Sequence, residues 1–283
     1  MARNIRDTAF VTEDGVTLAA SLAAPPGGTE TVIVIAPALA VPRRLYSTFS
    51  RFVADRGFAV LSFDHRGFGE SGPAWRAEAA GGVAALGRLD LDAALRHAAA
   101  LPGIRTVRVV AHSFGLLLFA MAPSRHLVSR AVSVASGTPH HRFQAFPRNL
   151  LHLFLWSIVV PRVARVHGYF PGRNLGLVGD MPEAVARDIA LACRNRDAFL
   201  PRESDWAGTL FATGFSDDDI APPEAVADLH RGFPRAALHL AQLVPADIGM
   251  TQCGHYGAFL PSARDYWTQV VECLRPDAAE QAA

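Results

Sequence analysis

The chain contains no lysine: all 27 of its basic residues are arginine. This absence excludes a lysine nucleophile, Schiff-base chemistry, a lysine-containing phosphate loop and a serine–lysine dyad, because each needs the lysine amine. Codon bias in a GC-rich genome is a sufficient explanation for it. Cysteine is also scarce, and Cys193, Cys253 and Cys273 form no C-x-x-C pair. We therefore expect neither a disulfide framework nor a zinc site.

Charge of one sign is not in excess, since 26 acidic residues balance the arginines and the formal net charge is +1. A nucleic-acid partner is not expected, because phosphate binding needs a basic surplus. Residues 1–10 (MARNIRDTAF) hold no apolar run of the kind found in signal peptides. The longest strongly apolar stretch, residues 150–160, is about half the length of a membrane span. These absences predict a cytoplasmic bacterial protein without stable membrane insertion and leave its oligomeric state open.

Hydrophobic residues make up 50% of the chain, and their pattern alternates between strand and helix. A β-hairpin is predicted where residues 9–11 and 16–22 flank the turn Glu13-Asp14-Gly15. Unbroken apolar runs typical of parallel strands stand at 31–38, 58–63, 107–111 and 131–135. Helices are predicted at 45–56, at 90–101 and from residue 113 onward. The alternation predicts an α/β fold, with a mostly parallel central sheet and helices on both faces.

This alternation stops between about residues 137 and 208, where only helical segments are evident. One such helix is predicted over 181–193, with Asp180 and Glu183 as a capping box. Strands and helices return at 209–215, 223–231, 239–244 and 262–274. We therefore predict one α/β core, residues 1–136 and 209–283, with a helical cap or lid, residues 137–208, inserted before the seventh strand.

The pentapeptide Ala111-His112-Ser113-Phe114-Gly115 stands where the apolar run VRVVA meets a predicted helix. In this strand–turn–helix context a serine is presented on a tight turn, and small residues are needed two positions before and after it. Ala111 and Gly115 meet that need. A serine that only caps a helix is the plainer interpretation of such a match, but the context favours a nucleophile.

A serine nucleophile needs a base, and the base needs an orienting carboxylate. Both occur later in the chain, in the order expected for this kind of site. Asp218 follows the predicted strand 209–215, and His255 lies in a glycine-flanked loop. Asp218 stands four residues before Pro222, the offset expected for the orienting acid, while Asp217 and Asp219 are alternatives or helix caps. The candidate triad is therefore Ser113, Asp218 and His255.

Two main-chain amides should face the negative charge that develops in such a reaction. Phe114, the residue after the nucleophile, supplies one candidate, and Ala38 or Leu39, after the first parallel strand, supplies the other. The cap stretch 150–160 is expected to help line an apolar acyl pocket, although a helix packed on the core would show the same pattern. The candidate pocket residues are Leu39, His112, Leu155, Trp156 and Tyr256. For His112, packing beneath the turn is the plainer role.

Two further patterns imitate cofactor sites. Residues 67–72 (GFGESG) match G-x-G-x-x-G after a predicted strand, and Asp92 follows at the distance of a ribose-binding acid. However, Asp92 falls inside a predicted helix, and residues 64–66 separate the strand from the first glycine, which disfavours dinucleotide binding. The histidine pair at 140–141 has no second cluster of metal ligands beside it in the sequence. We expect no cofactor and no metal.

Residues 64–72 (DHRGFGESG) resemble the D-x-R-G-x-G-x-S segment of lysophospholipase-like and serine-aminopeptidase-like members of the α/β-hydrolase superfamily. Residues 168–188 (GYFPGRNLGLVGDMPEAVARD) and 253–259 (CGHYGAF) are similar to a bacterial subgroup of predicted hydrolases. The resemblance covers nearly the whole chain and implies an α/β-hydrolase fold, the triad Ser113–Asp218–His255 and esterase-type activity. Ala111 in place of glycine, and residues 36–37 (Ala-Pro) in place of His-Gly, depart from the pattern. The second departure bears on the role of Ala38.

Together these features predict a serine hydrolase that cleaves an ester, thioester or amide of a small, apolar acyl substrate through an acyl-enzyme. Acyl transfer to an alcohol or amine, and carbon–carbon bond cleavage, can use the same fold and triad. A non-catalytic receptor on the same scaffold is an alternative from a different class. A membrane-surface lipase is a further variant, supported only by the apolar cap stretch.

Overall fold

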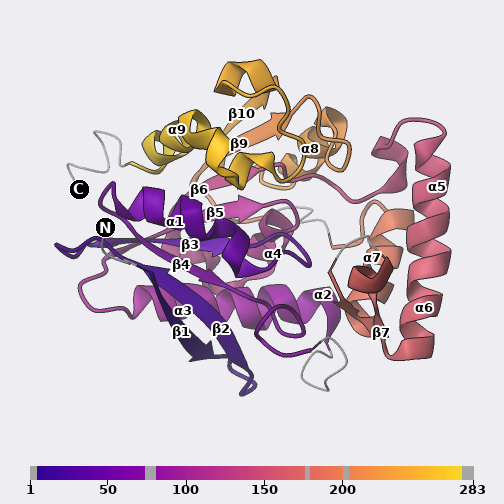
Figure 1. Cartoon of the computed structure of the whole chain (residues 1–283), viewed down its shortest axis with the longest axis horizontal. Helices are drawn as coiled ribbons and strands as arrows, with labels where there is room; N and C mark the ends of the chain where they lie inside the picture. The colour runs from indigo at the N-terminus through magenta and orange to yellow at the C-terminus, as the bar shows by residue number, and fades with distance from the viewer. Residues whose placement is uncertain (1–4, 74–80, 176–178, 200–203, 276–283) are drawn as a thin grey trace.

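A mostly parallel sheet of eight strands forms the centre of the molecule (Figure 1). The computed structural model describes residues 5–73, 81–175, 179–199 and 204–275. The order across the sheet is β1-β2-β4-β3-β5-β6-β9-β10. The strands are β1 (Ile5–Val11), β2 (Thr17–Ala23), β3 (Thr31–Ala36), β4 (Ala59–Phe63), β5 (Thr106–His112), β6 (Val128–Val134), β9 (Thr209–Phe215) and β10 (Ala237–Leu243). Within this sheet, only the pairs β1–β2 and β2–β4 are antiparallel, so the predicted mostly parallel sheet is confirmed.

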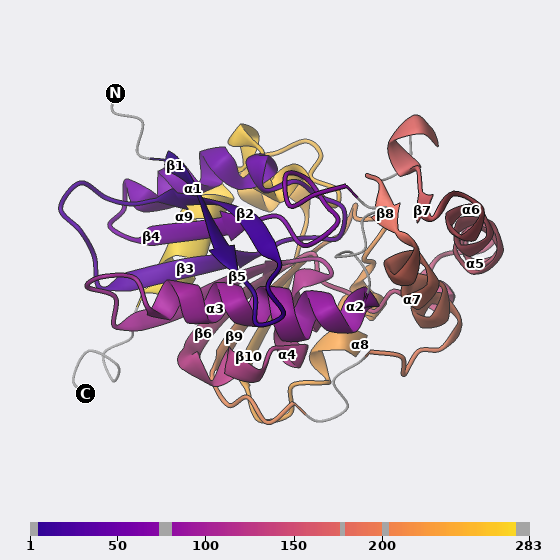
Figure 2. The same ribbon diagram turned by 90° about the horizontal axis from the view of Figure 1, so that it is seen from below.

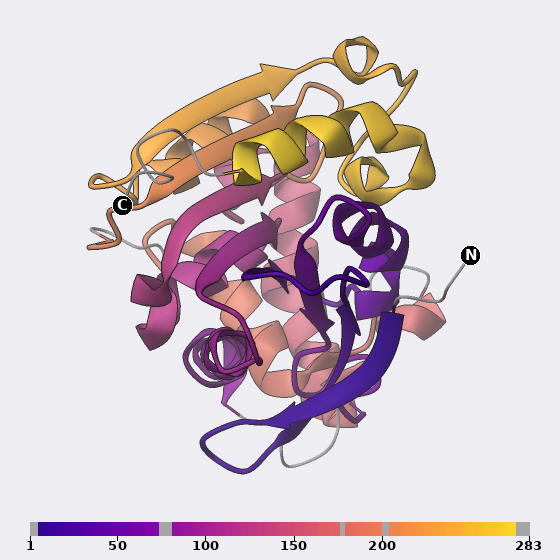
Figure 3. The same cartoon turned by 90° about the vertical axis from the view of Figure 1, so that its left-hand side faces the viewer.

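Both faces of the sheet are covered by helices, because successive side chains of a strand point to opposite faces. In β3, Val32 and Val34 join one apolar core, and Ile33 and Ile35 join the other. Helices α1 (Ser47–Ala54) and α9 (Arg264–Leu274) pack on the Ile33 side, and α3 (Asp92–Ala99) and α4 (Gly115–Met121) pack on the Val32 side. Figure 2 shows α1 above β3 and β4, with α3 below them. Figure 3 shows how the sheet twists from β1 and β2 to β9 and β10.

The helix before β5 is longer than predicted. It begins with α2 (Gly82–Ala85), continues through a π-helical turn at Leu86–Leu91 and ends with α3. The prediction began at residue 90 because the glycines before that point lower helix propensity. Tertiary packing outweighs this preference, since Val83 and Leu86 are fully buried. Asp90 is also buried and accepts a hydrogen bond of 2.6 Å from the guanidinium of Arg66.

The segment between β6 and β9 is largely helical. Helix α5 (Arg148–Phe154), a π-helical turn at Leu155–Val159 and α6 (Val160–His167) follow one another without a break. Helix α7 (Glu183–Arg194) lies between them and the rest of the molecule (Figures 1 and 2). Two short strands, β7 (Tyr169–Phe170) and β8 (Met181–Pro182), pair here and were not expected. The division into a core and a cap at residues 137 and 208 stays a prediction.

The predicted capping box of α7 is wrong. The helix begins at Glu183 with Pro182 at its N-cap, because Met181 and Pro182 are held in β8. Asp180 is directed elsewhere: its carboxylate accepts a hydrogen bond of 3.2 Å from the main-chain amide of Arg173.

Candidate active site

Ser113 occupies a tight turn between β5 and α4. Its φ of +54° lies in the left-handed region, which is costly for a residue with a Cβ and persists only where surrounding contacts fix it. One such contact is the bond of 2.9 Å from the Ser113 amide to the carbonyl of Val134 in β6. A Cβ at Gly115 would lie 2.2 Å from the carbonyl oxygen of Ala36, so glycine is required there. Ala111 is buried in β5, where the surrounding packing accommodates its methyl group.

The side chains of Ser113, His255 and Asp218 form one hydrogen-bonded chain. The Nε2 atom of His255 lies 2.7 Å from Ser113 Oγ, and its Nδ1 atom lies 2.8 Å from Asp218 Oδ2. A carboxylate can only accept, so Nδ1 carries the proton and Nε2 is free to accept the serine proton. Because His255 and Asp218 are both buried, little water competes with these bonds.

Asp218 is held ionised by its surroundings. Burial alone would raise the pKa of this carboxyl, but the hydrogen bond and charge of His255 lower it more. The amides of Ile220 and Ala221 add to this effect, since both donate to Asp218 Oδ1, at 2.8 and 3.0 Å. The net pKa lies below the ordinary value of an aspartate, so the carboxylate stays charged beside the imidazole.

The two neighbouring aspartates have other contacts. Asp217 Oδ2 accepts the amides of Cys253 and Gly254, at 2.8 and 3.0 Å, and thereby fastens the loop that carries His255. Asp219 is exposed and forms an ion pair of 2.8 Å with Arg148, at the start of α5. Of the three adjacent acids, only Asp218 therefore has the contact that an orienting carboxylate needs.

His112 does not line the cavity in front of Ser113, contrary to its place among the candidate pocket residues. It is fully buried beneath the turn, and burial is the main reason that its pKa falls to about 3. The neutral ring donates from Nε2 to the carbonyl of His255, at 2.9 Å, and its Nδ1 accepts from the hydroxyl of Tyr46, at 2.9 Å. His112 therefore supports the base from below.

The amide of Ala38 is not free to face a developing negative charge. It donates to the hydroxyl oxygen of Tyr46, at 3.0 Å, and this bond is buried. This bond counts against Ala38, the first choice for the second amide, and leaves Leu39, the alternative, as the candidate. Leu39 and Phe114 both line the cavity that contains Ser113, and neither of their amides has an acceptor in the described part of the chain. Sequence patterns could not reveal this, because Tyr46 carries no motif of its own.

A cavity of ≈ 480 Å³ opens in front of Ser113 and His255, within the usual range for small-molecule sites. Four of the five candidate pocket residues line it: Leu39, Leu155, Trp156 and Tyr256. Leu155 and Trp156 belong to the π-helical turn, a feature that often occurs at functional sites. Val160, within the stretch 150–160 expected at the pocket, also lines it, whereas sequence reasoning missed the apolar lining residues Phe170, Met181, Ile189 and Ile220. No local pattern marks them, because the packing of distant segments brings them together.

His152 and Gln144 are the polar side chains that the segment after β6 adds to this cavity. Gln144 donates from Nε2 to the carbonyl of Ile220, at 3.1 Å, so its amide is already oriented. Burial, with smaller effects from His141 and Arg148, lowers the pKa of His152 to about 4. His152 is therefore neutral at pH 7, and the wall that it shares with Leu155 and Trp156 carries no formal charge.

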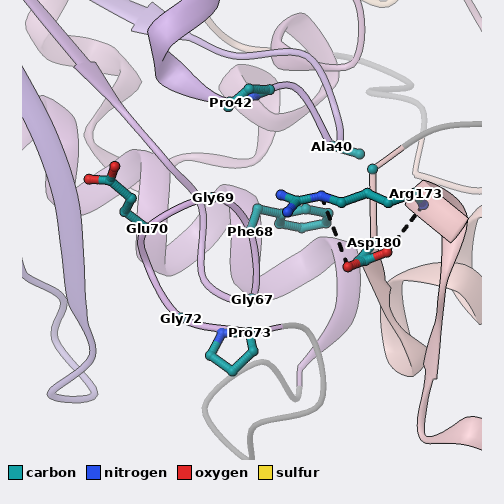
Figure 4. A pocket seen from close by; sticks show the side chains of 11 residues that line it. Ala40, Pro42, Gly67, Phe68, Gly69, Glu70, Gly72, Pro73, Arg173 and Asp180 are labelled. Atoms are coloured by element: carbon teal, nitrogen blue, oxygen red, sulfur yellow. Dashed lines mark hydrogen bonds and ion pairs between the residues drawn. The ribbon is translucent and has the colours of Figure 1, made fainter.

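The glycine-rich loop at residues 67–72 is built around Asp64, not around a phosphate. Asp64 accepts two bonds of 2.7 Å, one from the amide and one from the guanidinium of Arg43, and its carboxylate would lie 2.4 Å from a Cβ at Gly69. Asp92, the other half of the nucleotide-like pattern, accepts the amide of Ser124 instead. Figure 4 shows the small cavity beside this loop, where Arg173 and Asp180 meet apart from the triad.

Comparisons with known proteins agree on the fold. A family model described as alpha/beta hydrolase fold matches residues 31–158. A search of curated proteins gave no match. Among solved structures, the α/β hydrolase GrgF from Penicillium sp. sh18 is 15% identical with a TM-score of 0.70, and 99% of each chain is covered. A soluble variant of monoglyceride lipase from Saccharomyces cerevisiae, in complex with a substrate analogue, is 14% identical with a TM-score of 0.70; 94% of this chain and 95% of that one are covered.

A third similar structure is Est1E from Butyrivibrio proteoclasticus with bound ferulic acid, which is 14% identical with a TM-score of 0.62. The likeness covers 98% of this chain and all of that one (100%). At such identities the likeness speaks for the fold alone, and it agrees with the strand order and with the family match. The protein therefore has an α/β-hydrolase fold, and its residues 31–158 match the family model of that fold.

Proposed function

We propose that this protein is a serine hydrolase that cleaves an ester, thioester or amide bond of a small molecule with an apolar acyl group. The single observation that carries the proposal is the hydrogen-bonded chain Ser113–His255–Asp218 at the floor of a largely apolar cavity. A serine hydroxyl becomes a useful nucleophile only when a base takes its proton and a carboxylate orients that base. The likeness in fold to a monoglyceride lipase in complex with a substrate analogue, and to Est1E with bound ferulic acid, is consistent with this proposal.

In the first half of the reaction, Ser113 Oγ attacks the acyl carbon and His255 Nε2 takes the hydroxyl proton. The carbonyl oxygen becomes an oxyanion, which the amides of Leu39 and Phe114 would stabilise. The imidazolium, stabilised by Asp218, then gives its proton to the leaving alcohol, thiol or amine, and an acyl-enzyme forms. In the second half, water gives a proton to His255 and attacks the same carbon; the bond from that carbon to Ser113 Oγ then breaks, His255 returns the proton to Oγ, and the acid is released.

The acyl group would lie against the wall formed by Leu155, Trp156 and Val160, which all line the cavity in front of Ser113. This wall is apolar, and the histidine in it, His152, has a pKa of about 4. A charged acyl chain would lose its hydration there without gaining an ionic partner. An uncharged hydrocarbon or aromatic acyl group is therefore the proposed substrate class.

The test uses a fluorophosphonate probe, which forms a covalent bond to an activated serine. Wild type should be labelled and Ser113→Ala should not, with Ser136→Ala, a buried serine outside the cavity lining, as the matched control. p-Nitrophenyl esters of increasing chain length then measure turnover. Equal labelling of wild type and Ser113→Ala would overturn the proposal. Labelling without hydrolysis of any ester, thioester or amide would instead point to acyl transfer, and ligand-induced thermal stabilisation without labelling to a receptor.

A further inference from the structure

The helical run α5–α6 carries an exposed apolar face. It extends from Arg148 to His167 over 20 residues, about 30 Å. Its most apolar window of 18 residues has a mean hydropathy of 1.2, and only 17% of that window is buried. This helix is longer than the apolar run seen in the sequence. Its exposed apolar side chains, with Phe146 just before it, form what we term the outer face: Phe146, Leu150, Leu151, Phe154, Ile158 and Val166, from 37% exposed at Ile158 to 80% at Val166.

The opposite face of the same helix has a different role. His152, Leu155, Trp156 and Val160 line the cavity in front of Ser113. The helix is thus the wall between that cavity and the outer face. Figures 1 and 2 show α5 and α6 at the margin of the molecule, with α7 on their inner side. The outer face is therefore free to meet another surface.

The formal charges carried by the helix α5–α6 itself have one sign. No acidic residue stands between Asp92 and Asp180 in the sequence, whereas Arg142, Arg148, Arg162 and Arg165 all do. Arg162 and Arg165 follow Ile158 by four and seven residues, so they continue the stripe of Leu151 and Phe154 along one helix face. Both are exposed and form no ion pair within the described residues. The outer face therefore combines an apolar stripe with unneutralised positive charge.

We propose that the outer face docks on an anionic lipid bilayer, with α5–α6 lying in the plane of the interface. A helix with a strong apolar stripe and arginines beside it is the arrangement that binds such surfaces. A second copy of this chain is a poorer occupant, because α5–α6 carries arginines and no acidic residue that could pair with the arginines of another copy. A helix that crosses the bilayer is excluded by the inner face, which lines the cavity.

Docking would place the cavity about one helix diameter, roughly 10 Å, from the bilayer. A lipid-dissolved acyl substrate would then reach Ser113 past the helix that touches the membrane. This last consequence rests on the proposed function, whereas docking itself does not. The two are separated by measuring docking on the full chain carrying Ser113→Ala, which would bind lipid without turnover.

The experiment is co-sedimentation with two kinds of vesicle, one of phosphatidylcholine alone and one of equimolar phosphatidylcholine and phosphatidylglycerol, at low and high NaCl. We expect binding to the anionic vesicles that weakens with salt, and at least about tenfold weaker binding to the neutral ones. Equal binding to both vesicles, or none to either, overturns the proposal. If the wild-type protein binds no vesicles but self-associates, and the double variant Leu151→Ser with Phe154→Ser does not self-associate, the outer face is a contact between copies instead.

Two double variants test the face itself. Leu151→Ser with Phe154→Ser removes apolar contact, and Arg162→Gln with Arg165→Gln removes charge; each should weaken vesicle binding about tenfold or more. The matched control is Leu238→Ser with Leu240→Ser on β10, since these leucines are also exposed. Hydrolysis of a short soluble ester without vesicles should stay at the wild-type rate in all three, which also reports correct folding. If the control substitutions weaken vesicle binding as much as Leu151→Ser with Phe154→Ser does, the proposal fails.

Discussion

The main-chain amide of Ala38 donates a hydrogen bond to the phenol oxygen of Tyr46, at 3.0 Å, and that phenol in turn holds His112. A single hydroxyl thus links the loop after β3 to the support of His255. Tyr46→Phe keeps the ring and removes this link.

Tyr46→Phe should destabilise the fold by about 2 kcal/mol, because the Ala38 amide and His112 Nδ1 lose a buried partner. We also expect kcat to fall roughly tenfold with KM little changed, since Tyr46 acts through the residues that position His255. Urea unfolding and ester kinetics measure the two effects. Unchanged kcat together with unchanged stability would contradict this role.

The three adjacent aspartates should differ sharply when each is changed to asparagine. Asp218→Asn should lower kcat by roughly 10⁴-fold, because the tautomer and charge of His255 are no longer fixed. Asp217→Asn should mainly lower stability, by about 2 kcal/mol, since it weakens the bonds to the amides of Cys253 and Gly254. Asp219→Asn should stay within about twofold of wild type, because its ion pair is exposed. Comparable kcat values for the three variants would refute the assignment.

Substitutions at the two small residues that flank Ser113 should differ in their effect on stability. Gly115→Ala should destabilise the protein by about 3 kcal/mol or prevent folding, because the new Cβ meets the carbonyl of Ala36. Ala111→Gly should cost only about 1 kcal/mol, the usual effect of glycine in a strand. Thermal unfolding of the purified variants checks both. A Gly115→Ala protein as stable as wild type would show that the turn can relax.

Stability should fall as the pH drops from about 6.5 to about 4. Burial lowers the pKa of His112 to about 3 and the pKa values of His152 and His230 to about 4. In this window the unfolded chain takes up protons that the folded chain does not, so acid favours unfolding, by a few kcal/mol in total. Above about pH 6.5 these histidines are neutral in both states and the effect ends.

Urea midpoints across this pH range measure the slope. His230→Gln should flatten it, since His230 is buried against Val226 and Ser133, while the exposed His167→Gln serves as the control. A slope that is the same in His230→Gln and wild type would speak against this origin.

Chain-length preference should depend on the π-helical turn. Leu155→Ser with Trp156→Ser should lower kcat/KM for long acyl esters at least about tenfold more than for acetate, because only the long chain reaches that wall. A series of p-nitrophenyl esters measures the ratio. A uniform loss across chain lengths would mean that these side chains only pack the helix on the core.

Some of these features could be predicted from the sequence because they obey local rules. The parallel strands are continuous apolar runs, and Ser113 stands in a strand–turn–helix context that few other arrangements produce. Asp218 was chosen by its offset from Pro222, and its contact with His255 agrees with that choice.

Other features arise from contacts that no local pattern encodes. The role of Ala38 depends on a hydroxyl eight residues further along, and the cavity wall depends on how α7 meets β7. Helix α2 begins among glycines, where tertiary contacts stabilise it: Val83 is buried, and its amide donates to the carboxylate of Asp188, at 2.8 Å. The apolar pattern does not predict the full length of the helix α5–α6, because Pro161 and the arginines of α6 end the apolar run while the helix continues to His167.

The three aspartates also have a consequence for how this chain can vary in length. Three consecutive residues connect one short loop to the His255 loop, to His255 itself and to the start of α5. Because neighbouring positions point in different directions, gaining or losing one residue between β9 and α8 (Pro223–His230) would misdirect all three contacts at once. That loop can change its composition at Asp219, but its length is fixed.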